Sequence, residues 1–185
     1  MSDPDPRDEI VEHLPSLRAF ARSLTRNPAR ADDLVQDALL KAWSNIHKFE
    51  PGTNMRAWLF TILRNTFYSE RRKAAREVED VDGAFTAGLS EKPAHDGRLA
   101  FRDFAVAFNQ LSVEQREILV LVGGSGFSYE EAAEMTGIAI GTVKSRANRG
   151  RMRLAELMGL SDADSLDITD QATVAVMSAS KTAAA

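Results

Sequence analysis

Residues 127–154 hold the pattern that most constrains the fold, a short helix followed by a glycine turn and a basic helix. Ser128 and Glu131, three residues apart, form a capping box that opens the short helix. Gly137 can adopt the left-handed conformation that ends this helix. Thr142 is placed to cap the second helix. The order of these signals predicts a helix-turn-helix.

The second helix of this motif has two different faces. Val143, Ala147 and Leu154 recur at helical spacing and predict an apolar side. No acidic residue lies between positions 141 and 154, whereas a merely solvated helix usually mixes charges of both signs. A helix in the major groove needs long donors for base edges and guanidinium groups for phosphates. We therefore predict DNA binding by Lys144, Ser145, Arg146, Asn148, Arg149 and Arg151.

Composition excludes several other classes of protein. The net charge of −4 is unusual for a nucleic-acid-binding protein, but the charge is unevenly distributed along the chain. The chain has no cysteine, which excludes disulfides and thiolate metal sites. Its histidines share no ligand-like spacing, so we expect no metal and no cofactor. No apolar run reaches the ~20 residues of a membrane span, and the acidic N-terminus is no signal peptide, so we expect a cytoplasmic protein.

A helix over residues 31–46 is predicted in the first part of the chain, after a break at Asn27-Pro28. Its apolar stripe consists of Leu34, Val35, Ala38, Leu39, Ala42 and Trp43. The residues outside or at the edge of the stripe are Asp33, Gln36, Asp37, Leu40 and Lys41. Periodicity alone indicates only a core helix with a solvated back.

A further helix follows the turn at Pro51-Gly52, with Thr53 or Asn54 as its cap. Its second half is basic and is interleaved with aromatic residues. Two interpretations stay open from the residues alone. The helix either follows phosphates and stacks on unpaired bases, or it is a core helix whose basic end suits the helix dipole. The basic residues are Arg64, Arg71, Arg72, Lys73 and Arg76.

The composition changes over residues 77–98, where acidic side chains lie among glycine, serine and proline, and this predicts a flexible linker. Residues 99–158 return to helical periodicity, and residues 159–185 are expected to be a disordered tail. The predicted fold is all-α, with two small helical domains, 8–76 and 99–158, joined by the acidic linker.

Three segments in order resemble the bacterial extracytoplasmic-function (group 4) sigma factors of RNA polymerase. They are ARADDLVQDALLKAW, PGTNMRAWLFTILRNTFYSERRK and FSYEEAAEMTGIAIGTVKSRANRGRMRL. The second segment is most similar to the EcfG type, the general stress response sigma factors of alphaproteobacteria. The resemblance covers both helical domains and implies a protein that directs promoter-specific transcription initiation. It also implies that the protein has no small-molecule substrate and is not an enzyme.

The resemblance assigns partners to the surfaces left unexplained above. The helix over 32–43 matches the segment that docks on the β′ clamp of core RNA polymerase, with Asp33, Gln36, Asp37 and Lys41 as contacts. The helices over 111–122 would help to bind the β flap. An anti-sigma factor is also implied, of the NepR type if the EcfG resemblance holds.

The DNA contacts implied by the resemblance fall on two segments. The loop over 49–55 and the following helix match the segment that opens the −10 element and holds a flipped base. Candidates for that pocket are Asn54, Arg56 and Trp58, and candidates for the strand's phosphates are Arg64, Arg71, Arg72 and Lys73. The helix-turn-helix matches the reader of the −35 element. Lys144, Ser145, Asn148 and Arg149 fall on base-reading positions, and Arg146 and Arg151 fall on phosphate contacts.

Competing functions are less compatible with the sequence. An autonomous helix-turn-helix regulator needs a dimer interface or an effector domain, and the sequence indicates neither. A sigma-like protein that only titrates an anti-sigma factor should lose its DNA-reading side chains, yet Lys144, Arg146 and Arg149 are present. An enzyme needs a nucleophile motif, a phosphate loop or a metal cluster, and we find none of these patterns.

Overall fold

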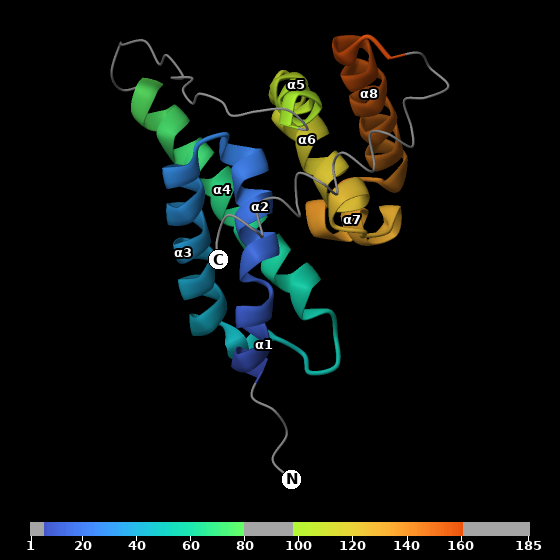
Figure 1. The fold of residues 1–185 in the computed structure, drawn as a ribbon. Coiled ribbons are helices and arrows are strands. Elements are labelled where there is room, and N and C mark those ends of the chain that lie inside the picture. The colour runs from blue at the N-terminus through green and yellow to red at the C-terminus, as the bar shows by residue number, and fades with distance from the viewer. Residues whose placement is uncertain (1–5, 80–97, 161–185) are drawn as a thin grey trace.

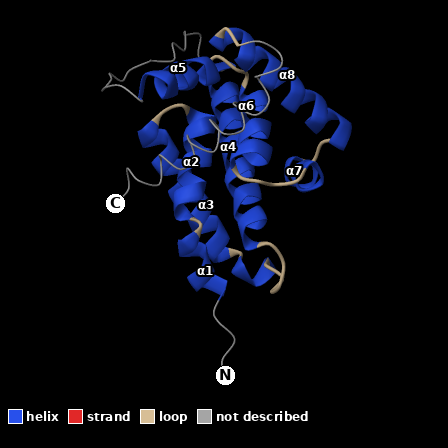
Figure 2. Ribbon diagram, turned by 45° about the vertical axis from the view of Figure 1, so that its right-hand side comes forward, coloured by secondary structure: helices blue, strands red, loops and turns tan. Residues whose placement is uncertain are grey.

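The computed structural model describes residues 6–79 and 98–160, and every regular element in these two ranges is helical. The predicted linker and tail lie outside the described residues, apart from residues 77–79, 98 and 159–160. The all-α prediction is confirmed. Figure 1 shows two groups of helices side by side, and Figure 2 shows the same helices from a second direction. The first group contains α1 (Pro6–Glu12), α2 (Leu14–Thr25), α3 (Pro28–Ser44), the short η1 (Ile46–Lys48) and α4 (Met55–Glu79).

The second group contains the helix-turn-helix. Its elements are α5 (Arg98–Asn109), α6 (Val113–Leu119), the π-helical turn η2 (Val120–Gly124), α7 (Tyr129–Thr136) and α8 (Ile140–Met158). The capping box of Ser128 and Glu131 is present, and Gly137 ends α7 with φ +68°, as predicted. Thr142 does not cap the last helix. That helix begins earlier, at Ile140, with Ala139 as its N-cap residue and no side-chain cap bond.

Helix α3 begins three residues before the predicted start. The Asn27 side chain accepts a hydrogen bond from the Arg30 amide at 3.0 Å, and Pro28 occupies the first helical turn. Proline is tolerated there because the amide it lacks has no partner within the helix. The sequence Asn27-Pro28 is therefore a helix start rather than only a break.

Trp43 was wrongly placed with the apolar stripe of α3. Leu34 and Ala42 of that stripe are buried, but Trp43 is 56% exposed. Successive helix residues are rotated by about 100°, so a residue next to the fully buried Ala42 can point outward. Its neighbour Leu40 is also exposed, at 67%. Leu40 lies outside the stripe as predicted, and only Trp43 makes the outer face of α3 less polar than the sequence indicated.

The hydrophobic core continues from one group of helices into the other. The Phe20 and Phe60 rings stack with centroids 4.8 Å apart inside the first group. Phe60 also packs in a T-shaped arrangement with Phe127, from the segment before α7, with ring centroids 5.3 Å apart. All three rings are at most 5% exposed. The domains therefore form a closed arrangement, with α4 against α7 and α2 against α6.

Candidate nucleic-acid interface

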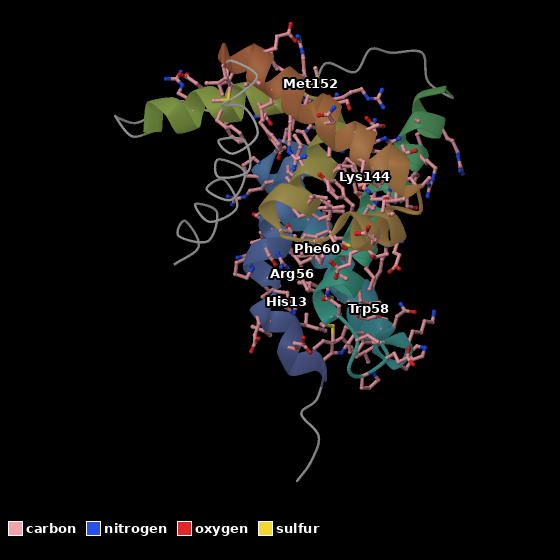
Figure 3. The ribbon with its side chains drawn as sticks, turned by 90° about the vertical axis from the view of Figure 1, so that its right-hand side faces the viewer. His13, Arg56, Trp58, Phe60, Lys144 and Met152 are labelled. Carbon is pink, nitrogen blue, oxygen red and sulfur yellow. The ribbon has the colours of Figure 1, made fainter. Side chains whose placement is uncertain are left out.

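Helix α8 presents a polar strip formed by Lys144, Ser145, Asn148 and Arg149, all of which are exposed. Its opposite side is buried by Val143, Ala147 and Leu154, so the fold leaves the strip facing outward. Arg149 is held along the helix, because its Nη2 donates to the Ser145 hydroxyl at 3.2 Å. The Lys144 ammonium lies 5.8 Å from the centroid of the Tyr129 ring, and Figure 3 labels it on α8. These four predicted base-reading residues share one surface.

The two arginines predicted to hold phosphates are less accessible. Arg146 is half-buried, and its charge helps to lower the pKa of Glu114. Burial alone would raise that pKa, but hydrogen bonds from the backbone and Ser112, together with Arg71 and Arg146, lower it overall. Arg151 is only 9% exposed and donates to the Tyr129 hydroxyl at 3.1 Å. Arg151 therefore has a packing role in this structure, which the sequence did not indicate.

The start of α4 holds the predicted −10 pocket residues. The Asn54 side chain caps the helix by accepting from the Ala57 amide at 3.0 Å, as predicted. Trp58 is half-buried and packs on Phe49, with ring centroids 5.3 Å apart. In Figure 3, Arg56 and Phe60 lie above Trp58, toward the second domain. The three candidates therefore come from one helix start but do not form a single cluster.

The second half of α4 divides its basic residues between two environments. Arg71, Arg72 and Lys73 are exposed, as a phosphate-binding surface requires. Arg64 is instead directed at the second domain, with its Nε donating to Oε1 of Glu117 at 2.6 Å. Phe60 and Phe67 are buried, so these aromatics belong to the core rather than to a stacking surface. Arg64, Phe60 and Phe67 therefore follow the core interpretation, and the exposed cations of this helix are left accessible to a ligand.

Glu117 of α6 is a buried carboxylate at the domain boundary. Its side chain is 0% exposed, and its second oxygen accepts from the Tyr68 hydroxyl at 3.0 Å. Burial raises the pKa of Glu117, while Arg64 and the hydrogen bonds from Tyr68 and Arg64 act in the opposite direction. A buried charge needs a partner and satisfied hydrogen bonds, and Arg64 and Tyr68 supply both.

Two arginines cap helix ends across the same boundary. Arg116 of α6 donates from Nε to the Ser23 carbonyl at 2.8 Å, at the end of α2. Arg26 donates from Nη1 to the Asn109 carbonyl at 3.1 Å, at the end of α5. The last carbonyls of a helix have no partner within it, and they carry the negative end of its dipole. Burial, with the nearby charge of Arg26, lowers the pKa of Arg116 to about 10.

The outer face of α3 combines charged and apolar side chains. Asp33, Gln36, Asp37 and Lys41 are all exposed. The Lys41 ammonium donates to the Thr66 hydroxyl of α4 at 3.2 Å, so it is partly fixed. The exposed Leu40 lies among these residues. Together with the exposed Trp43, three positions further along the helix, it makes this face partly apolar, and aromatic residues are enriched in protein interfaces.

Comparison with known proteins identifies the family. Residues 10–77 match the Sigma-70 region 2 family model, and residues 101–154 match the Sigma-70 region 4 model. The ECF RNA polymerase sigma factor EcfG of Rhodopseudomonas palustris is 53% identical over 158 residues, which cover 85% of this chain and 87% of that protein. The chain belongs to the ECF sigma factors. It directs promoter-specific transcription initiation, as the resemblance to this class predicted.

Other relatives place the sigma factor within the same class. CarQ of Myxococcus xanthus is 33% identical, with 82% of this chain and 88% of that protein covered. A solved structure of the sigma factor RpoE in complex with the anti-sigma factor NepR from Bartonella quintana gives a TM-score of 0.75 at 53% identity. It matches 83% of this chain and 96% of that chain. The EcfG-type resemblance is therefore confirmed.

Two further properties concern the described part of the sigma factor. None of its helices in residues 6–79 and 98–160 is both long and apolar enough to span a membrane. The same ranges contain no group of three or more His, Asp or Glu side chains placed to hold a metal ion. The homologues are sigma factors, which are not enzymes.

The residues at the domain boundary were not predicted from the sequence. Glu117 sits in the run Glu117-Ile118-Leu119-Val120-Leu121, and four of its neighbours in this run are apolar. Arg116 and Glu117 stand directly before these four apolar residues, and a charge buried at such a position needs a partner, because burial of an unpaired carboxylate is unfavourable. The sequence could not identify Arg64 as its partner, since 53 positions separate the two residues.

Proposed function

We propose that this sigma factor reads a two-part promoter with its two domains and assembles with core RNA polymerase through α3. In this proposal the first domain spans residues 8–76, the linker 77–98 and the second domain 99–158. The observation that carries the proposal is the outward polar strip of α8, in which Lys144, Ser145, Asn148 and Arg149 are all exposed. Side chains at the start of a recognition helix reach base edges in the major groove.

The −10 role is assigned to α4. Asn54, Arg56 and Trp58 would surround an unstacked base, and Arg64, Arg71, Arg72 and Lys73 would follow the phosphates of the same strand. Extrusion of a base costs a few kcal/mol, which stacking and pocket hydrogen bonds must offset. The row of exposed cations Arg71, Arg72 and Lys73 supports this assignment.

The polymerase contacts are assigned to two surfaces. Asp33, Gln36, Asp37 and Lys41 would bind the β′ clamp, and the exposed Leu40 supports a protein partner on this face. The α6 region would contribute to binding of the β flap. Because α6 packs against α2 and α8, this contact requires a rearrangement of the domains.

An anti-sigma factor of the NepR type is the proposed regulator, and stress-response genes are the proposed targets. The Bartonella quintana relative is a sigma factor solved in complex with NepR, at 53% identity to this chain. That relation supports the partner class. The proposed site of action is the cytoplasm, where core polymerase and the chromosome are found.

Footprinting of a complete initiation complex tests the DNA assignments. Core polymerase with the wild-type sigma factor should protect the −35 region and make −10 thymines reactive to permanganate. A Lys144→Ala/Arg149→Ala double variant should lose −35 protection. An Arg71→Ala/Arg72→Ala double variant should retain −35 protection and lose −10 opening. If both double variants lose the same protections, the division of labour between α8 and α4 is wrong.

A further inference from the structure

The proposed −10 surface of α4 is contacted by the second domain at three places. The Arg64 guanidinium meets the Glu117 carboxylate at 2.6 Å. The Arg56 guanidinium lies 5.0 Å from the centroid of the Phe127 ring. The Asn54 amide nitrogen lies 3.4 Å from Oε1 of Glu131. These contacts join residues far apart in the chain and involve two of the pocket candidates and one phosphate candidate.

The groups that the second domain places on α4 share binding properties with the phosphates and bases of single-stranded DNA. A carboxylate, like a phosphate, is an anion that accepts charge-assisted hydrogen bonds from arginine. An aromatic ring presents a π-face to a guanidinium, as an unstacked base does. Glu114 extends the acidic side of α6 toward Arg71 and Arg146, whose charges lower its pKa against the opposing effect of burial. An acidic and aromatic surface of the second domain thus covers a basic surface of the first.

We infer that the closed arrangement is an autoinhibited state, in which Glu117 and Phe127 occupy the places of a phosphate and an unstacked base on α4. The inference rests on the proposed −10 role of α4. DNA and the second domain then compete for Arg56 and Arg64, and each weakens binding of the other. Arg71, Arg72 and Lys73 stay exposed, so they can make a first electrostatic contact without opening.

The closed arrangement is maintained by more than the Arg64–Glu117 pair. Opening would separate the Phe60 and Phe127 rings and expose them to water, although both are at most 5% exposed in the closed arrangement. It would also remove the caps that Arg116 and Arg26 provide to α2 and α5. A partner that binds the separated domains better than the closed ones shifts the equilibrium toward opening. Core polymerase, which would hold α3 and α6 apart, is such a partner.

Distance measurements on the full chain test the closed state without DNA. The sequence has no cysteine, so cysteines introduced at the exposed Lys48 and Glu134 can carry spin labels at unique positions. The wild type should give one narrow distance distribution. Glu117→Arg places two cations together and should broaden the distribution and move it to longer distances. Arg64→Glu combined with Glu117→Arg reverses the pair and should restore the narrow distribution.

Glu156→Arg is the matched control for charge. Glu156 lies in the same domain and pairs with Arg153 at 2.7 Å on the exposed side of α8. This variant should keep the wild-type distances. The inference is overturned if Glu117→Arg matches the wild type, or if the reversed pair fails to restore the distances while its circular dichroism is unchanged.

Binding of a single-stranded oligonucleotide with the −10 sequence tests the masking itself. Glu117→Arg should bind it about fivefold tighter or more than Glu156→Arg, which carries the same change in charge. Saturating oligonucleotide should also broaden the distances of the wild type. Binding that leaves those distances unchanged would overturn the masking. If neither variant binds the oligonucleotide, the −10 assignment of α4 is wrong. The distance measurements still test whether the closed arrangement exists.

Discussion

Arg116 and Ser23 join the two domains of the sigma factor: the arginine Nε donates to the serine carbonyl at 2.8 Å. Arg116 is 4% exposed and also donates to the Leu111 carbonyl of its own domain at 2.5 Å. One guanidinium therefore satisfies carbonyls from both sides of the boundary. Buried carbonyls without a donor are unfavourable, so this residue is central to the closed arrangement.

Arg116→Met should destabilise the protein. The substitution keeps much of the side-chain volume but leaves the buried carbonyls of Ser23 and Leu111 without a donor, at a cost of roughly 1–3 kcal/mol for each. Urea unfolding measures the loss. Arg102→Met, at an exposed position of α5, is the control and should change the free energy of unfolding little. Equal losses in the two variants would contradict the capping role of Arg116.

Leu40→Ala should weaken binding to core polymerase without a loss of stability. Leu40 is 67% exposed, so its truncation removes no buried contact in the free protein. At an interface its side chain would be desolvated, and the expected loss of binding free energy is about 1–2 kcal/mol. Competition for core polymerase measures this loss. Val11→Ala on α1, 64% exposed, is the control, and a similar effect of both changes would exclude a specific role for α3.

Gly150→Ala should destabilise the packing of α8 on α6. A Cβ atom built at this position lies 3.1 Å from the Leu119 Cδ1 atom, and Leu119 is 1% exposed. We expect overpacking to outweigh the gain in helix propensity, with a net loss of about 1 kcal/mol. A Cβ at Gly141, near the start of the same helix, meets nothing within 4 Å. Gly141→Ala should therefore be neutral or stabilising. Thermal unfolding of the two variants, Gly150→Ala and Gly141→Ala, distinguishes overpacking from the gain in helix propensity.

Arg149→Ala should change which −35 sequences are used. If the guanidinium reads a base, its loss costs about 1–3 kcal/mol at one promoter position and relaxes specificity there. Transcription from promoters with single −35 substitutions measures the change. Arg153→Ala removes an exposed arginine that pairs with Glu156, and it should leave the base preferences intact. A uniform loss across all −35 sequences would make Arg149 a phosphate contact instead.

Tyr68 should resist ionisation in alkaline solution. Burial, followed by the charge and hydrogen bond of Glu117, raises the pKa of its phenol well above the usual 10.0. A raised folded-state pKa contributes stability that is present below about pH 10 and is lost as the pH rises further. Tyrosinate absorbance should therefore show a late component that appears with unfolding. The Tyr68→Phe variant should lack that component, and early ionisation of Tyr68 would contradict the contact with Glu117.

Local signals in the sequence predicted the local structure well. The Ser128–Glu131 capping box, the Gly137 turn and the buried side of α8 depend on residues within a few positions of one another, and all are confirmed. Two local predictions were wrong, the burial of Trp43 and the N-cap role of Thr142, because a nearby residue fits the same helical pattern in each case. Ala42 fills the core beside Trp43, and Ala139 precedes a helix that starts without a side-chain cap.

Sequence patterns could not predict the tertiary contacts between the domains. Arg64 is one basic residue among several on α4, and its own neighbours do not distinguish it from Arg71 or Arg72. Only the placement of α6 against α4 gives it a carboxylate partner. Arg151 likewise differs from Arg149 only by its position around the helix, which turns it toward Tyr129.

Run-off transcription with core RNA polymerase, with and without this sigma factor, tests its role in promoter-specific initiation most directly. Genomic promoter fragments serve as templates, and transcript ends are mapped. We expect starts that depend on the sigma factor and that share one −35 and −10 pair, with loss of these starts when Lys144 and Arg149 are both replaced by alanine. Transcripts that are the same with and without the protein, although it binds core polymerase, would contradict its role in promoter-specific initiation.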